Sequence, residues 1–485
     1  MSYVLLIAHI VVVLGLGTRI LLRDDMRPDV RMGWLVVLVL LPYASAVLYL
    51  LFGEVALSRG GKRKRLGVQA FMLRHLAIQD KAQHVKTTTA PHSRWLPAFA
   101  CAQSVNGFAV QAQQQVQLLG DGNQARAQLL KDLEAAHNYI HLLYYIWLDD
   151  QTGRAVAHAL IRAVQRGVQC RVIVDGLGSR ALVHSTLWKE MQAAGVQTAI
   201  DLSLQHWWRV MLTSRIDLRN HRKLSLIDGR IAYCGSQNCA DAAFLPKARY
   251  APWVDVLVRL QGSLVQQLEW VFASDWSQCA DTPWLPQTSP APVEPECRND
   301  NAGDVWAVTV AEGPTERART TSQLVSTLLA NARHSIGITT PYFVPDATVL
   351  DALACAALRG VRVQLTVPAR NDSWIVGAAS RSSYRRLLLA GAEIAEFQDG
   401  LLHAKTLCVD SEVVLVGSTN LDLRSFDINL ENNLLLHSPR LAHEFATLQA
   451  HYRTRSKAVT LHEVQAWSWS KRIWNHLWAM LSPIL

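Results

Sequence analysis

Histidine and lysine occur two residues apart at two places in this 485-residue chain. The first stretch, from His221 to Asn238, reads H-R-K-L-S-L-I-D-G-R-I-A-Y-C-G-S-Q-N. The second, from His403 to Asn420, reads H-A-K-T-L-C-V-D-S-E-V-V-L-V-G-S-T-N. Both have Asp seven residues after the histidine and end in Gly-Ser-x-Asn. A repeat so dense in polar side chains predicts one reactive centre with a contribution from each copy.

The spacing of these residues favours chemistry on a phosphodiester. Residues i and i+2 of a strand face the same side, so His221 and Lys223 project together, and so do His403 and Lys405. One imidazole can attack phosphorus while the other protonates the leaving oxygen, and a pKa of about 6.5 suits both roles. The ammonium groups would stabilise charge on the phosphate oxygens. The resulting phosphohistidine would be released by an alcohol or water, without a metal or other cofactor.

Further polar residues of each copy could hold the phosphate or orient the histidines. Two carboxylates could orient the rings: Glu431, 28 residues after His403, and Asp255, 34 residues after His221. The aspartates of the repeated stretch lie at strand turns, where we expect them to brace the motif rather than touch phosphate. The candidate catalytic set is His221, Lys223, Asp228, His403, Lys405 and Asp410, and the phosphate-binding or supporting set is Ser236, Asn238, Ser418, Asn420, Asp255 and Glu431.

The elements that must position these residues also occur twice. In each half a helix, a strand, a second helix ending at glycine and a second strand precede the histidine. Arg166-Gly167-Val168 matches Arg359-Gly360-Val361 at an offset of 193 residues, whereas the histidines are offset by 182. The first copy therefore carries eleven extra residues, around 205–215. Its K-L-S-L-I-D-G-R-I-A-Y run predicts two strands joined at Asp228-Gly229.

These patterns predict an α/β fold with two similar repeats packed around one shared site. Five prolines between the repeats are typical of a linker. The predicted organisation is 1–55, two transmembrane helices; 56–104, a basic connecting segment; 105–280, the first repeat; 281–304, the linker; and 305–485, the second repeat with a Trp-rich C-terminal helix.

The N-terminal segment is strongly apolar. Residues 3–22 and 33–52 are each long enough, as helices, to cross a hydrocarbon core of about 30 Å. We expect a transmembrane hairpin; the alternative is one span and an interfacial helix. Arg and Lys after the second span slightly outnumber those between the spans, which favours cytoplasmic termini and a cytoplasmic catalytic part.

Composition restricts the partners of the chain. A net charge of +9 and a pI of 9.2 favour an anionic partner, either nucleic acid or an anionic membrane. The eight cysteines lack metal-type spacing and are expected to be free thiols of a reducing compartment. His137 and His141 have helical metal spacing, but packing or surface roles are the preferred interpretation.

At the doubled H-x-K-x4-D the chain resembles the phospholipase D superfamily, and within it the bacterial cardiolipin synthases. Supporting stretches are the repeated motifs themselves, W-V-D at 253–255, T-P-Y-F-V-P at 340–345, R-N-D-S at 370–373 and G-S-T-N-L-D-L-R-S-F at 417–426. The resemblance implies transfer of a phosphatidyl group between two phosphatidylglycerol molecules, which gives cardiolipin and glycerol. It also implies a multi-pass protein of the inner membrane, with His221 as nucleophile and His403 as acid.

Other functions use the same residues. A membrane-bound phospholipase D would hydrolyse the intermediate or pass it to other alcohols, a nuclease would cleave nucleic acid, and a scaffold would not react. The apolar N-terminus disfavours a nuclease, so no nucleic-acid partner is expected, and two intact motifs disfavour a scaffold. Candidate lipid-facing segments are the insertion, with Trp207, Trp208, Arg209, Met211, Leu212 and Arg215, and the Trp-rich C-terminal helix, for which docking onto the domain is the alternative.

Overall fold

A computed structural model gives the fold of this chain. It describes residues 2–24, 26, 28–53, 67, 68, 70, 71, 74, 93–112, 114–203, 217–280, 284, 286, 305–314 and 317–480. The chain divides into a unit that contains the N-terminal helices and a larger unit that contains both histidine–lysine stretches. The insertion at 205–215 and nearly all of the predicted linker lie outside the described residues.

The N-terminal unit consists of short helices packed on one another. Helix α1 covers Ser2–Leu21, α2 covers Pro28–Leu40, α3 covers Pro42–Leu48, and a π-helical turn, η1, covers Tyr49–Gly53. The second apolar run is divided where Pro42, which has no N–H to donate, begins α3. Ile20, Trp34, Leu38 and Tyr49 form the buried contact between these helices. Across the described parts of the chain, no helix is both long and apolar enough to cross a membrane.

The first repeat contains one seven-stranded sheet. Its strand order is β1-β8-β6-β5-β2-β3-β4, with β2, β3 and β4 parallel to one another and the remaining neighbours antiparallel. The strands are β1 Gln115–Leu119, β2 Tyr139–Tyr144, β3 Gln169–Asp175, β4 Gln197–Asp201, β5 Lys223–Ile227, β6 Ile231–Gly235 and β8 Leu257–Gln261.

The second repeat contains an eight-stranded sheet in the same order, read from its other edge. The order is β19-β13-β12-β10-β15-β16-β18-β9, so β19 is the only addition among the described strands. These strands are β9 Trp306–Glu312, β10 Ser335–Thr339, β12 Arg362–Pro368, β13 Glu393–Phe397, β15 Thr406–Val409, β16 Val413–Gly417, β18 Glu431–His437 and β19 Ser456–Val459. The predicted α/β duplication is confirmed, and so is the strand pair on either side of Asp228-Gly229.

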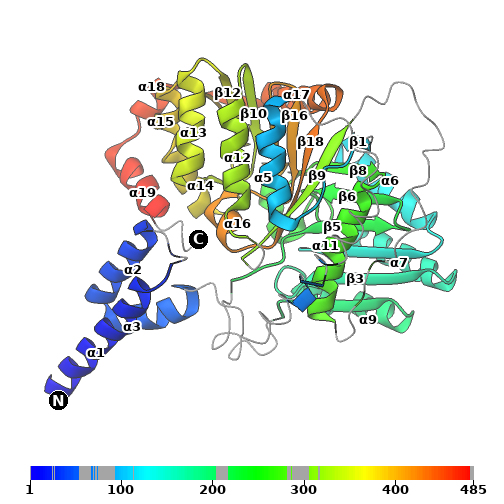
Figure 1. Cartoon of the computed structure of the whole chain (residues 1–485), viewed down its shortest axis with the longest axis horizontal. Helices are drawn as coiled ribbons and strands as arrows, with labels where there is room; N and C mark the ends of the chain where they lie inside the picture. Colours follow the sequence, from blue (N-terminus) through cyan, green and yellow to red (C-terminus); the bar gives the residue numbers. More distant parts are fainter. Residues whose placement is uncertain are drawn as a thin grey trace. The chain divides into compact units, whose positions relative to one another are not determined.

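Helices cover both faces of each sheet. In the first repeat the outer layer buries the apolar stripes of α6 Gly122–Glu134, α7 Gln151–Gln165 and α9 Thr186–Ala193 against the strands. In the second repeat α12 Thr320–Asn331 and α13 Ala347–Leu358 lie side by side over the sheet (Figure 1). The inner layer is formed by α11 Leu264–Cys279 and α17 Pro439–Thr454, and each of these helices also contacts a strand of the other repeat.

The two repeats share backbone pairing as well as a core. Strand β7, Trp253–Val254, pairs in parallel with β14, Leu401–Leu402, and Asn220 forms a bridge with Leu430. One cluster of buried apolar residues contains members of both repeats, including Leu224 and Leu407. The repeats are therefore two halves of one folded body.

Helix α5, Leu96–Asn106, belongs to this body. It packs against α12 and β9, and its Phe99 and Ala102 are buried in the shared core. The predicted connecting segment, 56–104, therefore ends within a core helix. The remaining elements are η2 Ser93–Trp95, α8 Arg180–Val183, η3 Leu245–Tyr250, β11 Phe343–Val344, α14 Trp374–Arg381, α15 Tyr384–Leu389, β17 Leu421–Asp422, α16 Leu423–Asp427, α18 Leu461–Gln465 and α19 Trp469–Met480.

Candidate active site

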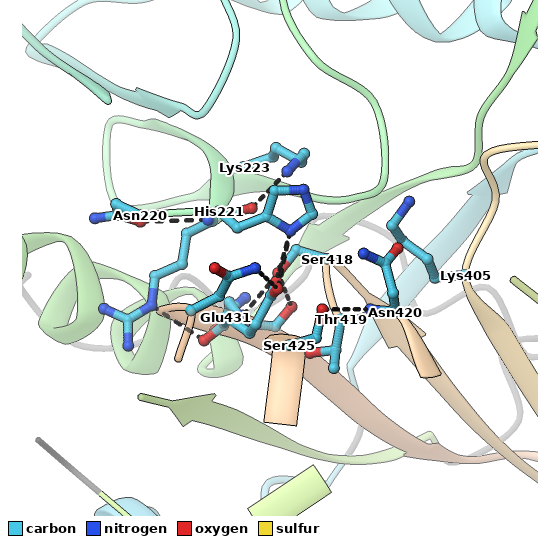
Figure 2. A network of polar contacts seen from close by, with 12 residues as sticks. Asn220, His221, Lys223, Lys405, Ser418, Thr419, Asn420, Ser425 and Glu431 are labelled. Atoms are coloured by element: carbon cyan, nitrogen blue, oxygen red, sulfur yellow. Dashed lines mark hydrogen bonds and ion pairs between the residues drawn. The ribbon is translucent and has the colours of Figure 1, made fainter. Parts of the chain in front are cut away.

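Each histidine of the repeated stretch is paired with a carboxylate of the other repeat. His221 Nδ1 lies 2.9 Å from both carboxylate oxygens of Glu431 (Figure 2). His403 Nδ1 lies 2.6 Å from Oδ1 of Asp255. In the sequence each carboxylate follows the histidine of its own repeat. In the fold, each carboxylate instead binds the histidine of the other repeat. Within the described residues Nε2 of neither ring has a hydrogen-bond partner, so both rings present this nitrogen for chemistry.

The carboxylates reach across because backbone pairing brings each motif beside the other repeat. The amide N–H of His221 donates to Leu430 O, one residue before Glu431. Likewise the N–H of His403 donates to Val254 O, one residue before Asp255. Neighbouring strands lie about 5 Å apart, so these bonds place each ring next to a carboxylate of the adjacent segment.

The serines of both Gly-Ser-x-Asn runs hold these carboxylates. Ser236 Oγ donates to Asp255 Oδ1 at 2.6 Å, and Ser418 Oγ donates to Glu431 Oε2 at 2.5 Å. Each serine also accepts a backbone N–H, from Val256 and Asn432 respectively. The two hydroxyls are thus occupied in positioning the carboxylates rather than directed at a ligand.

The two lysines are buried beside the histidines. Lys223 Nζ donates to the backbone oxygen of His221, and Lys405 Nζ donates to that of His403 at 2.7 Å. Burial opposes their charge and lowers the pKa of Lys223 to about 7 and that of Lys405 to about 8, although nearby carboxylates act in the opposite direction. Lys405 also lowers the pKa of Lys223, so the two buried amino groups are near enough to act on one another, and an anionic phosphate beside them would be stabilised.

The same environment favours neutral imidazoles. Burial lowers the pKa of His221 to about 4; Glu431 opposes this shift, and Lys223 adds to it. The pKa of His403 is also lowered, first by burial and then by Lys405. An anionic phosphate between the lysines would offset their field and raise both pKa values.

The carboxylates remain ionised despite their burial. Burial opposes ionisation of Asp255, but its attraction to His403 and the hydrogen bonds it accepts hold its pKa at about 2. Glu431 behaves alike: burial is the largest single effect and raises its pKa, but attraction to His221 and Lys223 and the hydrogen bonds from His221 and Ser418 together keep the pKa below the usual value. Each histidine therefore has a fixed negative charge behind it.

The asparagines of the Gly-Ser-x-Asn runs retain unused hydrogen-bonding atoms. Asn238 Oδ1 accepts the N–H of Ile146 at 3.2 Å, whereas its Nδ2 has no partner in the described part of the chain. Asn420 is also buried and has an unpaired side-chain amide oxygen, an atom that exchanges with the amide nitrogen by a flip of the side chain. Buried amides without partners are rare, so these groups are suited to a phosphate oxygen.

The aspartates of the repeated stretch lie away from the histidines. Asp228 has a positive φ of 53° at the hairpin turn, and its carboxylate accepts the backbone N–H groups of His137, Asn138 and Tyr139. Asp410 has a φ of 52° and accepts three N–H groups at the start of β10 in the same way. Each aspartate ties its hairpin turn to the start of the neighbouring strand.

Two aromatic residues next to the histidines were not predicted as site residues. The ring of Tyr145 lies edge-on to His221, with centroids 4.9 Å apart, and Lys223 Nζ lies 5.3 Å from its centroid. Trp253 packs against His403 at 4.6 Å, and its buried indole Nε1–H has no partner in the described part of the chain. The W-V-D run, with its tryptophan on the same strand face as Asp255, was the available sequence signal.

The residues behind the two histidines differ. Arg222 is buried, and it donates to Asp275 at 2.7 Å and to the backbone oxygens of Glu431 and Glu312. The corresponding residue of the second repeat is Ala404. His221 is therefore supported by a buried ion pair that His403 lacks, which makes the two halves of the site unequal.

His137 is exposed, whereas His141 lies in the core of the first repeat. His141 is buried between the rings of Tyr139 and Phe272, which agrees with the predicted packing role. Among the described residues, no group of three or more His, Cys, Asp or Glu side chains could hold a metal ion.

Known proteins resemble the chain over its full length. Residues 129–276 and 325–451 match the family described as cardiolipin synthase, PLD-like domain, and residues 4–54 match the phospholipase D-nuclease N-terminal family. Cardiolipin synthase A of Pectobacterium atrosepticum is 33% identical over 486 residues, which cover 100% of this chain and 98% of that protein. Cardiolipin synthase A of Serratia proteamaculans is 33% identical over 485 residues, with the same coverage.

The fold also has a solved counterpart. The crystal structure of phosphatidylserine synthase from Haemophilus influenzae matches 80% of this chain and 99% of that chain with a TM-score of 0.58 and 16% identity. At this identity the likeness concerns the fold alone. The full-length matches and the paired histidine–lysine motifs together place the chain in the cardiolipin synthase family of phospholipase D-like proteins.

Proposed function

We propose that this protein is a cardiolipin synthase, a phosphatidyltransferase that joins two phosphatidylglycerol molecules and releases glycerol. The observation that carries the proposal is the exchanged pairing of His221 with Glu431 and His403 with Asp255, which builds one site from two half-sites. Two oriented imidazoles, each with a buried lysine beside it, match what a phosphodiester needs: a nucleophile, an acid and charge stabilisation.

In the first half-reaction His221 Nε2 attacks the phosphorus of one phosphatidylglycerol. The bond between phosphorus and the headgroup glycerol oxygen breaks, and His403 gives its Nε2 proton to that oxygen. Glycerol leaves, and the phosphatidyl group stays on His221. The side chains of Lys223, Lys405 and Asn238 would hold the non-bridging oxygens as charge develops on them.

In the second half-reaction a headgroup hydroxyl of another phosphatidylglycerol attacks the phosphohistidine. His403, now neutral, takes the proton of this hydroxyl, and the phosphorus–nitrogen bond to His221 breaks. Cardiolipin is released, and both histidines return to their starting protonation states. Water in place of the lipid hydroxyl would give phosphatidic acid, as in a phospholipase D.

The assignment of His221 as nucleophile is supported by its environment. Its low pKa keeps the ring neutral, as a nucleophile must be. The two oxygens of Glu431, both 2.9 Å from Nδ1, stabilise the charge that the ring acquires when it is phosphorylated. His403 has a single 2.6 Å bond to Asp255, and the charge of this carboxylate favours a proton on the ring.

The remaining predicted residues would act on these groups rather than on the phosphate. Ser236 and Ser418 position the carboxylates, and Asp228 and Asp410 fix the hairpin turns. The amide of Asn420 would join Asn238 on the phosphate.

Membrane attachment belongs to the proposal. We propose that the N-terminal helices anchor the protein in the inner membrane as a hairpin, with the catalytic unit on the cytoplasmic side. Large apolar side chains on the outside of α1 and α2 support this, among them Ile7, Val11, Leu14 and Val39. Exposed apolar surface of this extent is typical of contact with lipid or another protein.

A product assay tests the function. Purified protein in detergent or nanodiscs receives phosphatidylglycerol, and lipid products and glycerol are followed. We expect equimolar cardiolipin and glycerol. If phosphatidic acid were the main lipid product, the protein would be a phospholipase D and not a cardiolipin synthase.

A second substrate tests the roles of the histidines. Phosphatidyl-p-nitrophenol has a leaving group that needs no proton, so the first-turnover burst of p-nitrophenol depends on the nucleophile alone. We expect His403→Ala to lose turnover on phosphatidylglycerol but keep this burst, and His221→Ala to lose both. A burst in His221→Ala and none in His403→Ala would reverse the assignment.

Removal of metal ions is a further test. We expect EDTA to leave cardiolipin formation unchanged within error, because side chains supply both the proton transfer and the charge stabilisation. Loss of activity in EDTA that added Mg²⁺ or Zn²⁺ restores would contradict this.

A further inference from the structure

The C-terminal helix α19 presents two unlike faces. At 3.6 residues per turn, Trp469, Ile473, Leu477 and Met480 fall within about 80° of arc. Trp474 and Trp478 point away from this stripe, towards the body of the second repeat. One apolar face of the helix therefore packs on protein, although Trp474 stays 46% exposed, and the other face is open.

The packed face contacts α14. The ring of Trp374, the first residue of α14, stacks on Trp474 with centroids 5.6 Å apart and meets Trp478 edge-on at 4.9 Å. Asn475 is buried on the same side. The described part of the Trp-rich segment thus docks onto the domain, which was one of its two predicted roles.

This contact lies two residues from a loop at the active site. Asp372 accepts the hydroxyl of Tyr342 at 2.7 Å and Nζ of Lys247 at 2.5 Å. Its charge also acts on Lys405, whose pKa it raises. Trp374, two residues after Asp372, therefore joins α19 to a segment that Tyr342 and Lys247 hold in place.

The other face of α19 is apolar and open. Trp469 is 76% exposed, Ile473 59% and Met480 78%, although a soluble surface rarely gathers such residues. His476 lies at about 60° and Arg472 at about 100° from the centre of the stripe, on the same side of it, and both are exposed. An apolar stripe with Trp and Met at its ends and a basic border is typical of a helix in the lipid headgroup region.

We propose that α19 is an interfacial membrane helix, which inserts Trp469, Ile473, Leu477 and Met480 into an anionic lipid surface and so holds the Asp372 loop of the active site at the bilayer. Lipid is the favoured occupant because basic Arg472 complements anionic headgroups. The proposed contact does not depend on which reaction the site performs.

Site-specific fluorescence tests the contact in the full-length protein. The solvent-accessible thiol Cys355 and the linker residue Cys297 are replaced by serine, and Ile473→Cys is labelled with bimane. The protein is placed in nanodiscs of phosphatidylcholine, alone or with about 30% phosphatidylglycerol. Quenching is measured with doxyl-labelled lipid and with aqueous acrylamide. The matched control is Leu358→Cys, an exposed leucine on α13 of the same repeat.

We expect doxyl lipid to quench the probe at 473 at least about threefold more than the probe at 358, and more strongly with phosphatidylglycerol present. Arg472→Glu should remove the dependence on anionic lipid. Equal doxyl quenching at the two positions would overturn the proposal. Protection from acrylamide at 473 without doxyl quenching would also overturn it, because protein, either the N-terminal helices or a second copy, would then cover the face.

Discussion

Each histidine of this site depends on a carboxylate that lies far away in the sequence. Glu431 is 210 residues from His221, and Asp255 is 148 residues from His403. A carboxylate on Nδ1 fixes the tautomer and stabilises positive charge on the ring, whether that charge comes from a proton or from phosphorus. The exchange means that a substitution in one repeat should impair the histidine of the other.

Asp255→Asn tests this exchange. We expect it to lower the rate with phosphatidylglycerol by about 100-fold or more, because His403 loses the partner that keeps it a competent acid. With phosphatidyl-p-nitrophenol its first-turnover burst should return close to wild type. Glu431→Gln, the matched variant, should slow the burst on both substrates. Recovery by Glu431→Gln instead of Asp255→Asn would mean that each carboxylate serves its own repeat.

The buried lysines predict a pH dependence of substrate binding. Below pH 7 both are cationic; as the pH rises through about 7 and 8, first Lys223 and then Lys405 becomes neutral in the free protein. In the inert variant His221→Asn, the Kd for short-chain phosphatidylglycerol should rise about tenfold or more between pH 6.5 and 9, because charge-assisted hydrogen bonds are lost. The phosphodiester itself does not titrate in this range, so calorimetry reports the protein alone.

A lysine-to-arginine change is the control for this effect. Arg stays charged at every pH in this range. When Lys223→Arg is added to His221→Asn, the Kd for short-chain phosphatidylglycerol should therefore no longer begin to rise near pH 7. This expectation holds whatever the absolute affinity of the double variant. A Kd that stays constant up to pH 9 would contradict the depressed lysine pKa values.

At the scale of single elements, one buried carboxyl links β9 to the site. Glu312 accepts the N–H and hydroxyl of Thr321 at the start of α12 and the hydroxyl of Thr419 at 3.3 Å. Burial raises its pKa to about 8 from an ordinary 4.5, and Glu431 adds to the shift. The folded protein thus keeps a proton on Glu312 that the unfolded chain loses.

Glu312→Gln should therefore change how stability depends on pH. Below pH 4.5 both states of the wild-type protein bind this proton; between 4.5 and about 8 only the folded state does, so stability falls as the pH rises. The Tm of the variant relative to wild type should rise by several degrees from pH 5 to pH 8. If the glutamine amide also destabilised the fold by an amount that does not depend on pH, the Tm of the variant would be lower at every pH, but the change in the Tm difference between pH 5 and pH 8 would stay the same. If the plots of Tm against pH for wild type and Glu312→Gln ran parallel, Glu312 would have an ordinary pKa in the folded protein.

Some of the elements could be predicted from local sequence, and some could not. The alternation of apolar residues in K-L-S-L-I and the turn residues Asp228-Gly229 predicted β5 and β6 because both signals act over a few residues. The break of the second apolar run at Pro42 and the inclusion of α5 in the core were not predicted. Burial of Phe99 depends on α12 and β9, which lie more than 200 residues away.

At the scale of the whole molecule, the two repeats form one body. The β7–β14 pairing, the Asn220–Leu430 bridge and the shared core all cross between them. Arg222 adds a buried ion pair with Asp275 and donates to the backbone of the second repeat, and breaking such a pair typically costs about 3–5 kcal/mol. Neither half has a complete site without the other.

A cut in the linker tests this unity. With a protease site inserted within 281–304, we expect the cleaved protein to stay associated on size exclusion and to keep at least about half of its activity, because the inter-repeat contacts do not need that peptide bond. Fragments expressed singly should be inactive, and co-expression should restore activity. Separation of the cleaved halves into two folded proteins would contradict a single body.

The sequence by itself determined the reactive groups, the duplication and the α/β order, because residue types and short-range periodicity are local properties. It also supplied both orienting carboxylates as candidates. Only the tertiary structure decided which histidine each carboxylate serves, since that depends on how β7 meets β14 and how Leu430 meets Asn220, three residues before β5. The roles of Ser236 and Ser418 as supports, the aromatic neighbours Tyr145 and Trp253, and the open face of α19 were decided in the same way, by contacts between distant segments.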